Sequence, residues 1–395
     1  MKMKELIYIC IIFCFSLTAN GQNENEPKNQ ASEILERKED KLVFGGYGQI
    51  DFSKPLIKDV SANSLIDVSR LVLSMGYKFS PKTSFFTEIE FEHVRELFVE
   101  QVFVNHSFND YLNLRAGLLL IPMGIINEYH EPTTFNGVNR PSVDNIIVPT
   151  TWREIGIGFT GRLQEQGIKY QAYLVNGFSG YDGTKGLING SKFLRDARQR
   201  GARSFMTSPD LSVKIDYYGV PGLKVGASYY GGKSESALFR NLDLTNDDAV
   251  EQADSSVLGI SMAGVDLRYN TGGLALRGEM IFASIRNTAE YNAFTGNDAG
   301  RAVRGMYAEI SYNLLQKSSS PYSLIPFFRF ENYDTHYKVT QDLLDNESYM
   351  VNEYIVGVGL VLAPGAILKT DLQIAKPASG TPTRKTFNAG MGVWF

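Results

Sequence analysis

Cysteine is almost absent from this chain of 395 residues, which excludes two kinds of site. The only two cysteines, Cys10 and Cys14, lie in the first 21 residues. The rest of the chain therefore has no thiol that could form a disulfide or bind a metal. Histidine is also scarce, and the four histidines are too scattered along the chain to predict a metal site. We expect neither a metal nor a cofactor.

Long apolar runs are scarce as well. The clearest one, residues 6–17, follows a positively charged start and is followed by the small residues Ala19 and Gly21. This arrangement is typical of a cleaved export signal, so we predict a signal peptide over residues 1–21. Beyond it, no stretch approaches the roughly 18 apolar residues that a membrane-spanning helix needs.

Neither sign of charge dominates the chain. It carries 39 basic and 43 acidic side chains, which gives a net charge of −4. Removing the predicted signal, with Lys2, Lys4 and Glu5, changes this to −5. Such a near balance argues against a nucleic-acid partner.

Two common catalytic motifs are missing. Neither a G-x-S-x-G turn nor an H-E-x-x-H helix occurs, and we predict no enzymatic activity. The alternative is an outer-membrane barrel with an adhesive role, or a hydrolase whose serine, histidine and acidic residues meet only in the folded protein.

What the chain does contain is a pattern of alternation. Residues 22–40 are polar, and we interpret them as a flexible or short helical periplasmic leader. From Lys41 onward, apolar and polar side chains alternate, as where Leu71 and Leu73 share one face opposite Arg70. If this part lies in a membrane, it must be a closed barrel, because only helices and closed barrels satisfy every backbone polar group in lipid.

The connections between the alternating segments differ in length. Short turns are expected at 80–83, 109–110, 164–167, 219–222, 270–273 and 363–365, and long segments near 53–63, 121–150, 179–208, 232–256, 285–302, 334–350 and 376–385. Two places depart from this pattern: 93–96 is short for an outer loop, and 316–322 is long for an inner turn. Short periplasmic turns and long outer loops are typical of bacterial outer-membrane barrels. We predict an all-β fold, a transmembrane antiparallel β-barrel of about 16 strands over residues 41–395.

The chain ends with an aromatic residue, Phe395, on an alternating segment. This end resembles the signal by which outer-membrane proteins are handed to the barrel assembly machinery. We therefore predict a location in the outer membrane of a Gram-negative bacterium, with membrane lipid and the assembly machinery as partners.

Charged residues on the polar faces are expected to line the lumen, because positions that face lipid must be apolar. The predicted pore-lining positions on strands are Arg70, Glu88, Glu90, Glu92, Arg115, Lys214, Arg268, Arg277 and Arg329. Glu88, Glu90 and Glu92 form an acidic stripe, and two interpretations of it stay open. It is either a structural network with strand arginines such as Arg70 and Arg115, or a surface that draws cations through the pore.

The segment 121–150 is too long for a simple hairpin connection, and segments of this length usually carry function. It contributes the remaining predicted pore-lining residues, Glu128, His130, Glu131, Arg140 and Asp144. In sixteen-stranded porins the loop after the fifth strand folds inward, so we expect this third extracellular loop to form the constriction. The alternative is an ordinary surface loop.

Another long loop concentrates positive charge. It contains Arg195, Arg198, Arg200 and Arg203 within nine residues. Three interpretations stay open: the cluster gathers anionic solutes at the mouth, it contacts the phosphate groups of surface lipid, or it is simply solvated.

Four segments carry a resemblance to a known family: FTEIEFEH (86–93), VEQVFVNHSF (99–108), NLRAGLLLIPMGIINEYHEP (113–132) and NRPSVDNIIVPTTWREIGIGFTGRL (139–163). They resemble the phosphate-selective porin O and P family in its Bacteroidetes-type branch. The resemblance implies a homotrimeric sixteen-stranded porin with an inward-folded third loop. Phosphate selectivity is not carried over, because acidic residues interleave with the lumen arginines and the 121–150 segment has no lysine. We predict passive diffusion of small hydrophilic, charged solutes or ions, with phosphate and other anions as candidates.

Overall fold

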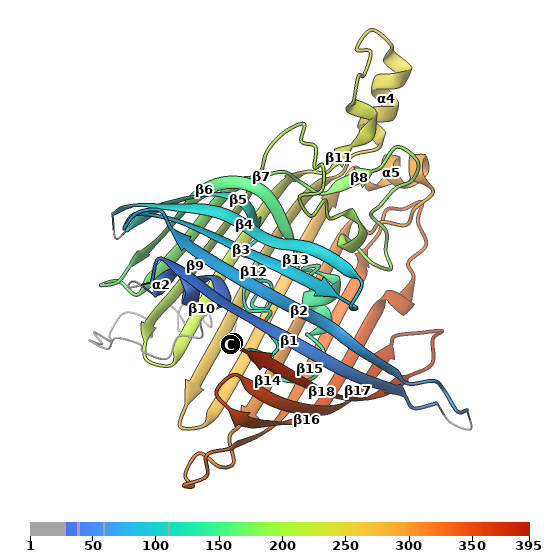
Figure 1. Ribbon diagram of the computed structural model, residues 1–395. Coiled ribbons are helices and arrows are strands. Elements are labelled where there is room, and N and C mark those ends of the chain that lie inside the picture. Colours follow the sequence, from blue (N-terminus) through green and yellow to red (C-terminus); the bar gives the residue numbers. More distant parts are fainter. Residues whose placement is uncertain (1–28, 38–39, 58–59, 110) are drawn as a thin grey trace, which may run out of the picture.

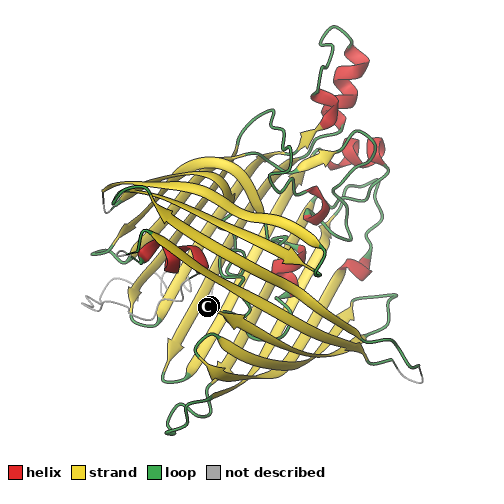
Figure 2. Cartoon of the chain, viewed as in Figure 1, coloured by secondary structure: helices red, strands yellow, loops and turns green. Residues whose placement is uncertain are grey.

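The computed structural model describes residues 29–37, 40–57, 60–109 and 111–395, and in them sixteen antiparallel strands close into a barrel (Figures 1 and 2). These strands are β1 (Leu42–Pro55), β2 (Leu65–Lys78), β3 (Thr83–Glu92), β4 (Glu96–Asn109), β5 (Leu112–Leu120), β6 (Arg153–Leu163), β7 (Ile168–Val175), β9 (Asp210–Val220), β10 (Leu223–Lys233), β12 (Gly259–Thr271), β13 (Leu274–Arg286), β14 (Ala302–Tyr312), β15 (Ser323–Lys338), β16 (Met350–Ala363), β17 (Ala366–Pro377) and β18 (Arg384–Trp394). Pairing of β1 with β18, where Tyr47 lies opposite Trp394, completes the ring. The predicted fold class and strand number are therefore confirmed.

The alternation in the sequence corresponds to the two faces of the barrel wall. Asp266 on β12 points inward and is 3% exposed, whereas its neighbours Val265 and Leu267 point outward and are 56% and 42% exposed. On β13, Met280 lies opposite Val265 and is also exposed. The outer face is thus apolar and the inner face polar, which is the reverse of a protein with a dry core.

The connections follow the predicted asymmetry. Short turns join β2 to β3, β6 to β7, β9 to β10, β12 to β13 and β16 to β17, while the long segments lie at the other end of the barrel. The two departures noted in the sequence are also present. The β3–β4 connection spans only 93–95, and the β14–β15 connection spans 313–322.

The helices of the described residues are all short, and none of them forms part of the barrel wall. They are α2 (Gln30–Glu36), α3 (Ser142–Ile146), α4 (Asp247–Ser255) and α5 (Thr288–Thr295), with single 3-10 turns η1 (Arg195–Ala197), η2 (Ala237–Phe239) and η3 (Glu347–Tyr349). None of these helices is long and apolar enough to cross a membrane. Helix α4 extends away from the barrel at the end with the long loops, where β8 (Ser179–Tyr181) and β11 (Glu235–Ser236) also form a small parallel sheet (Figure 1).

Helix α2 docks against the barrel at the end with the short turns. A capping box begins it: the Asn29 side chain accepts from the Ser32 amide at 2.9 Å, and Ser32 Oγ accepts from the Asn29 amide at 3.1 Å. Ile34 is buried over Gly76 of β2, where a Cβ atom would lie 2.3 Å from Ile34 Cγ2, so the close approach requires glycine. The Trp394 indole N–H donates to the side chain of Gln30.

Helix α2 belongs to the predicted periplasmic leader. Residues Gln30–Glu36 of this stretch form a helix. Its role as a periplasmic leader stays a prediction. The predicted signal peptide, residues 1–21, lies outside the described residues, as do residues 22–28 and 38–39 of the predicted leader.

Candidate functional site: an inner segment and an arginine-lined cavity

Residues 121–152, here called the inner segment, lie within the ring of strands. Their backbone amides donate to inward-facing carboxylates from several strands: Val138 to Asp371 at 2.7 Å, Ile125 to Glu279 at 2.8 Å and Val143 to Glu331 at 3.1 Å. These carboxylates belong to β17, β13 and β15, so the segment crosses the lumen.

One asparagine ties the two ends of the inner segment together. The Asn127 side-chain amide donates to the carbonyl oxygens of Ile121 at 2.7 Å and Trp152 at 2.9 Å. Its own oxygen accepts from the Trp152 amide at 2.7 Å. Trp152 is fully buried, and its ring centroid lies 4.6 Å from those of Phe178 and Tyr230. Since both ends are fixed, the segment is held inside the barrel.

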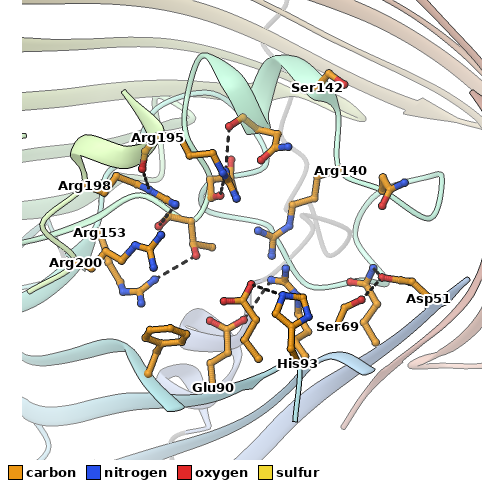
Figure 3. Close-up of a pocket in the computed structure, with 18 of the residues that line it drawn as sticks. Asp51, Ser69, Glu90, His93, Arg140, Ser142, Arg153, Arg195, Arg198 and Arg200 are labelled. Carbon is orange, nitrogen blue, oxygen red and sulfur yellow. Dashed lines mark hydrogen bonds and ion pairs between the residues drawn. The ribbon is translucent and has the colours of Figure 1, made fainter. Parts of the chain in front are cut away.

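A cavity of about 450 Å³, here called the arginine cavity, separates the inner segment from one side of the barrel wall (Figure 3). Six arginines and three carboxylates line it: Arg70, Arg140, Arg153, Arg195, Arg198 and Arg200 with Asp51, Glu90 and Glu92. They come from β1, β2, β3, β6, the inner segment and the loop that follows β7. Cations therefore outnumber carboxylates two to one, and the cavity is suited to an anion.

Two arginines of the β7–β9 loop hold the inner segment from outside. Arg195 Nη1 donates to the carbonyl oxygens of Asn145 at 3.1 Å and Thr150 at 3.0 Å. Arg198 Nη1 donates to the carbonyl of Pro149 at 2.8 Å. Arg195, Arg198 and Arg200 line the arginine cavity, and the three interpretations of this cluster stay open.

The other arginines of the cavity retain unused donors. Arg70 Nη1 lies 3.6 Å from Glu90 Oε1, an ion pair without a hydrogen bond. The buried Nε groups of Arg70, Arg140 and Arg153 have no hydrogen-bond partner among the described residues. Burial and the neighbouring Arg70 lower the pKa of Arg140 to about 10. Crowded guanidinium groups with free N–H donors are the groups that recognise carboxylate and phosphate oxygens.

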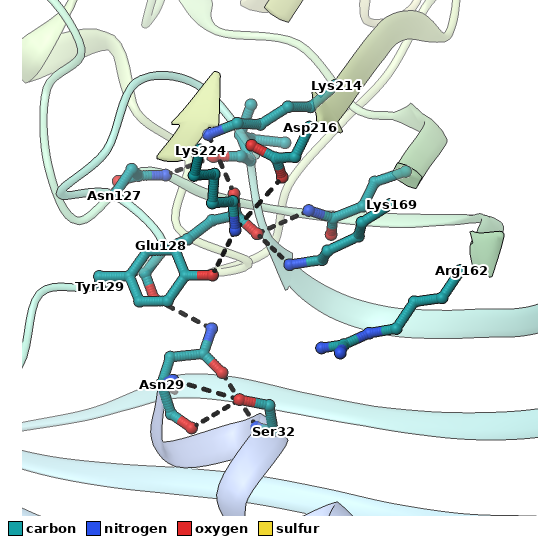
Figure 4. Close-up of polar contacts among 12 residues, drawn as sticks. Asn29, Ser32, Asn127, Glu128, Tyr129, Arg162, Lys169, Lys214, Asp216 and Lys224 are labelled. Carbon is teal, nitrogen blue, oxygen red and sulfur yellow. Dashed lines mark hydrogen bonds and ion pairs between the residues drawn. The ribbon is translucent and has the colours of Figure 1, made fainter. Parts of the chain in front are cut away.

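A second polar network ties the inner segment to the opposite wall (Figure 4). Lys214 of β9 is completely buried, and its Nζ lies 3.2 Å from Glu128 Oε2 and 3.3 Å from Asp266 Oδ2. Glu128 also accepts from Gln171 at 2.6 Å. The guanidinium group of Arg268 stacks 4.6 Å from the Tyr129 ring centroid. These charges are neutralised by one another, so this network is structural.

A third network holds two more of the predicted cations. Arg329 donates to Glu331 at 2.8 Å and to Glu309 at 3.1 Å. Arg277 donates to the Thr134 carbonyl at 2.8 Å. Asp144 is fully buried beside Glu331, and this burial and like charge raise the pKa of Asp144 to about 8.

A smaller cavity of about 230 Å³ lies on the side of the inner segment nearer the short turns, and helix α2 forms part of its wall. Arg115 lines it, with its guanidinium carbon 4.5 Å from the Phe103 ring centroid. Gln101, Glu128 and Lys169 line it as well. The proposed pairing of the acidic stripe with strand arginines therefore holds for Arg70 and is wrong for Arg115.

The structure divides the predicted pore-lining residues among five places. Arg70, Glu90, Glu92 and Arg140 line the arginine cavity; Glu128, Lys214 and Arg268 form the second network; Asp144, Arg277 and Arg329 form the third; and Arg115 faces the smaller cavity. Glu88, His130 and Glu131 are buried between the cavities. The sequence did not single out Arg153 and Glu100, which also face inward.

Comparison with known proteins gives one relative by sequence. An uncharacterized protein of Aquifex aeolicus (strain VF5) is 32% identical over 350 residues, which cover 86% of this chain and 77% of that protein. No family model matches the chain.

Several solved structures share the fold. The outer membrane channel DcaP of Acinetobacter baumannii superposes with a TM-score of 0.58 at 11% identity, over 90% of this chain and 97% of that one. The anion-selective porin from Comamonas acidovorans gives 0.56 at 11% identity, over 90% and 99%. OprB of Pseudomonas putida gives 0.56 at 9% identity, over 92% and 96%. At these identities the likeness concerns the fold alone.

Proposed function

The chain belongs to the same family as the Aquifex aeolicus protein, and from its porin-type barrel we propose that it is an outer-membrane porin through which small hydrophilic anions diffuse passively. One observation supports a negative charge on the solute: six arginines and only three carboxylates line the arginine cavity. Inorganic phosphate and small carboxylates are the solutes that such guanidinium groups bind best. Membership in the phosphate-selective porin O and P family remains a prediction.

The mechanism is steric and electrostatic. The inner segment occupies the lumen and limits the size of the solute. Free guanidinium N–H groups at Arg70, Arg140 and Arg153 replace part of the hydration shell that an anion loses at this point. No covalent step and no cofactor take part.

The membrane location, the export, the assembly and the oligomeric state of the barrel are part of the same proposal. The apolar outer face meets the hydrocarbon of the outer membrane, and the residues before Gln22 direct export. Phe395 presents the last strand to the barrel assembly machinery. Three copies assemble as a homotrimer, as the family resemblance implies.

Chloride efflux from proteoliposomes tests the proposal. Vesicles with the wild-type protein are expected to release chloride much faster than empty vesicles. The double variant Arg70→Gln/Arg140→Gln should slow the release severalfold, because it removes two charges from the cavity. Arg240→Gln, an exposed position outside the cavity lining, is the matched control and should leave the rate unchanged. Release no faster than from empty vesicles would refute the porin function, and equal rates for all variants would refute the role of the cavity.

A further inference from the structure

A buried cluster between the two cavities has no part in the proposed solute path. Glu88 of β3, Glu100 of β4 and His130 of the inner segment each place one ligand atom within 4.8 Å of the other two. Their exposed fractions are 0%, 0% and 1%. Two residues further along β3, Glu90 lines the arginine cavity, while Gln101, which lies opposite Glu88, lines the smaller cavity.

An irregularity in the sheet brings Glu100 into this cluster. Gln101 pairs with Glu88, and Val99 pairs with Ile89, so Glu100 is the extra residue of a β-bulge. Strict alternation would turn only one of Glu100 and Gln101 inward, but both are buried. Bulges of this kind re-aim side chains and are frequent beside functional sites.

The hydrogen bonds of the cluster fix the orientation of its three side chains. His130 Nδ1 lies 3.2 Å from the carbonyl oxygen of Asn127, which can only accept, so Nδ1 carries a proton. Nε2 lies 2.9 Å from the Tyr47 oxygen and 3.5 Å from Glu100 Oε2. Because the single Tyr47 proton goes to Glu100, Nε2 also carries a proton in this arrangement, and a bound cation would take the place of that proton. Metal-bound histidines are usually oriented by such a bond from the other ring nitrogen to a backbone carbonyl. The Tyr47 hydroxyl donates to Glu100 at 2.9 Å, and the Gln101 amide donates to Glu88, so both carboxylates are oriented as well.

Among the described residues, His130 is the one basic side chain in direct contact with the carboxylates of this cluster. Glu88, Glu100 and Glu131 are three buried carboxylates, and within the described ranges no lysine or arginine nitrogen lies within 4 Å of any of them. Glu100 Oε1 and Glu131 Oε2 are buried without a hydrogen-bond partner in the described part of the chain. Buried carboxylate oxygens of this kind are costly unless they are paired or bind a metal.

We propose that Glu88, Glu100 and His130 bind a divalent transition-metal cation of the zinc class between the inner segment and the barrel wall. One imidazole nitrogen with carboxylate oxygens suits Zn²⁺, whereas Ca²⁺ and Mg²⁺ prefer oxygen ligands only. The cation joins the inner segment to β3 and β4 and neutralises carboxylates that His130 alone does not. This inference is independent of which solute passes the barrel.

Metal analysis of the full-length protein tests the site. The protein is purified in detergent, stripped with EDTA, dialysed against dilute Zn²⁺ and analysed by mass spectrometry, with circular dichroism as the check on folding. We expect about one zinc per chain for the wild type, loss of zinc in His130→Ala, and at least tenfold weaker binding in Glu100→Gln. His106→Ala is the matched control, because His106 also lies on β4 but bonds to Thr83 at 2.8 Å. It should bind as the wild type does.

Cobalt provides a measurement that does not depend on the variants folding. Co²⁺ added to the stripped wild type should give visible absorption bands of a protein site with nitrogen and oxygen ligands. Folded wild-type protein without zinc and without such bands would overturn the metal site, as would zinc binding that is unchanged in Glu100→Gln. Chloride efflux is measured on the same protein to keep the two questions separate. A protein that conducts chloride but binds neither zinc nor cobalt would reject the metal site and leave the proposed porin function intact.

Discussion

Lys214 is the residue on which the second network depends most. Its ammonium group is fully buried, donates to the Gly124 carbonyl and lies within 3.3 Å of carboxylate oxygens from Glu128 and Asp266. A buried charge that loses its partner destabilises a protein far more than a lost surface pair does. A substitution at Lys214 can therefore be compared with one in an exposed ion pair of the same chain.

We predict that Lys214→Met lowers the free energy of unfolding by about 3–5 kcal/mol, because two buried carboxylates lose their cation. Lys192→Met is the control, since Lys192 pairs with Asp196 at 3.0 Å on the exposed surface, where such pairs contribute about 0–1 kcal/mol. Urea unfolding in lipid vesicles measures both. Equal effects of the two substitutions would contradict the assignment of Lys214 as a buried structural cation.

Asp144 makes stability depend on pH in a definite direction. Burial and Glu331 raise its pKa to about 8, above the value of about 4 expected in the unfolded chain. Between about pH 4 and pH 8, the Asp144 carboxyl therefore keeps its proton in the folded protein and has lost it in the unfolded chain. Its stabilising contribution is complete below pH 4 and declines as the pH rises to about 8.

Asp144→Asn, which stays neutral, is expected to remove this dependence. The variant should gain on the order of a few kcal/mol relative to wild type between pH 5 and pH 9, measured by urea unfolding at each pH. Asp248→Asn, on exposed helix α4, should follow the wild type throughout. An Asp144→Asn variant whose free energy of unfolding decreases relative to that of the wild type as the pH rises would contradict this assignment.

At the scale of elements, helix α2 narrows the end of the barrel with the short turns. It forms part of the wall of the smaller cavity, and the backbone amide of Gln30 donates to Glu131 of the inner segment at 2.6 Å. The Asn29 side chain also donates to the Glu128 carbonyl at 3.0 Å. The helix therefore touches the same segment that limits the lumen.

Deletion of residues 29–37 is predicted to raise the single-channel conductance, because it removes the helix from the mouth. Glu33→Gln, on the exposed side of α2, is the control and should conduct as the wild type does. Recordings in planar lipid bilayers compare the three proteins. A lower or unchanged conductance after the deletion would show that α2 does not restrict the path.

Elements of the wall were predictable from the sequence, while the contents of the lumen were predictable only in part. Strict alternation, as around Val265 and Asp266, shows where a strand lies and which of its side chains point outward. The gaps between alternating segments then give the lengths of the turns. Alternation fails at Glu100, where a bulge turns two successive residues inward, because no local pattern marks the extra residue. It also does not show that Arg198, far along the chain, meets Arg70 across the arginine cavity.

For the whole molecule, the two faces of the wall determine the function. The apolar outer face accounts for a barrel in lipid, and the charged inner face accounts for a path in water. The separation of charge inside the barrel is then the property that distinguishes the proposed pore from a neutral sieve. Paired networks hold the inner segment, and an excess of arginine lines the cavity beside it.

The zero-current potential of the purified protein in a planar bilayer tests this central claim most directly. With a tenfold gradient of KCl across the membrane, discrete channel steps should appear, and the potential should lie toward the equilibrium value for chloride. A potential toward the equilibrium value for potassium, or the absence of any steps from folded protein, would contradict an anion path through the arginine cavity.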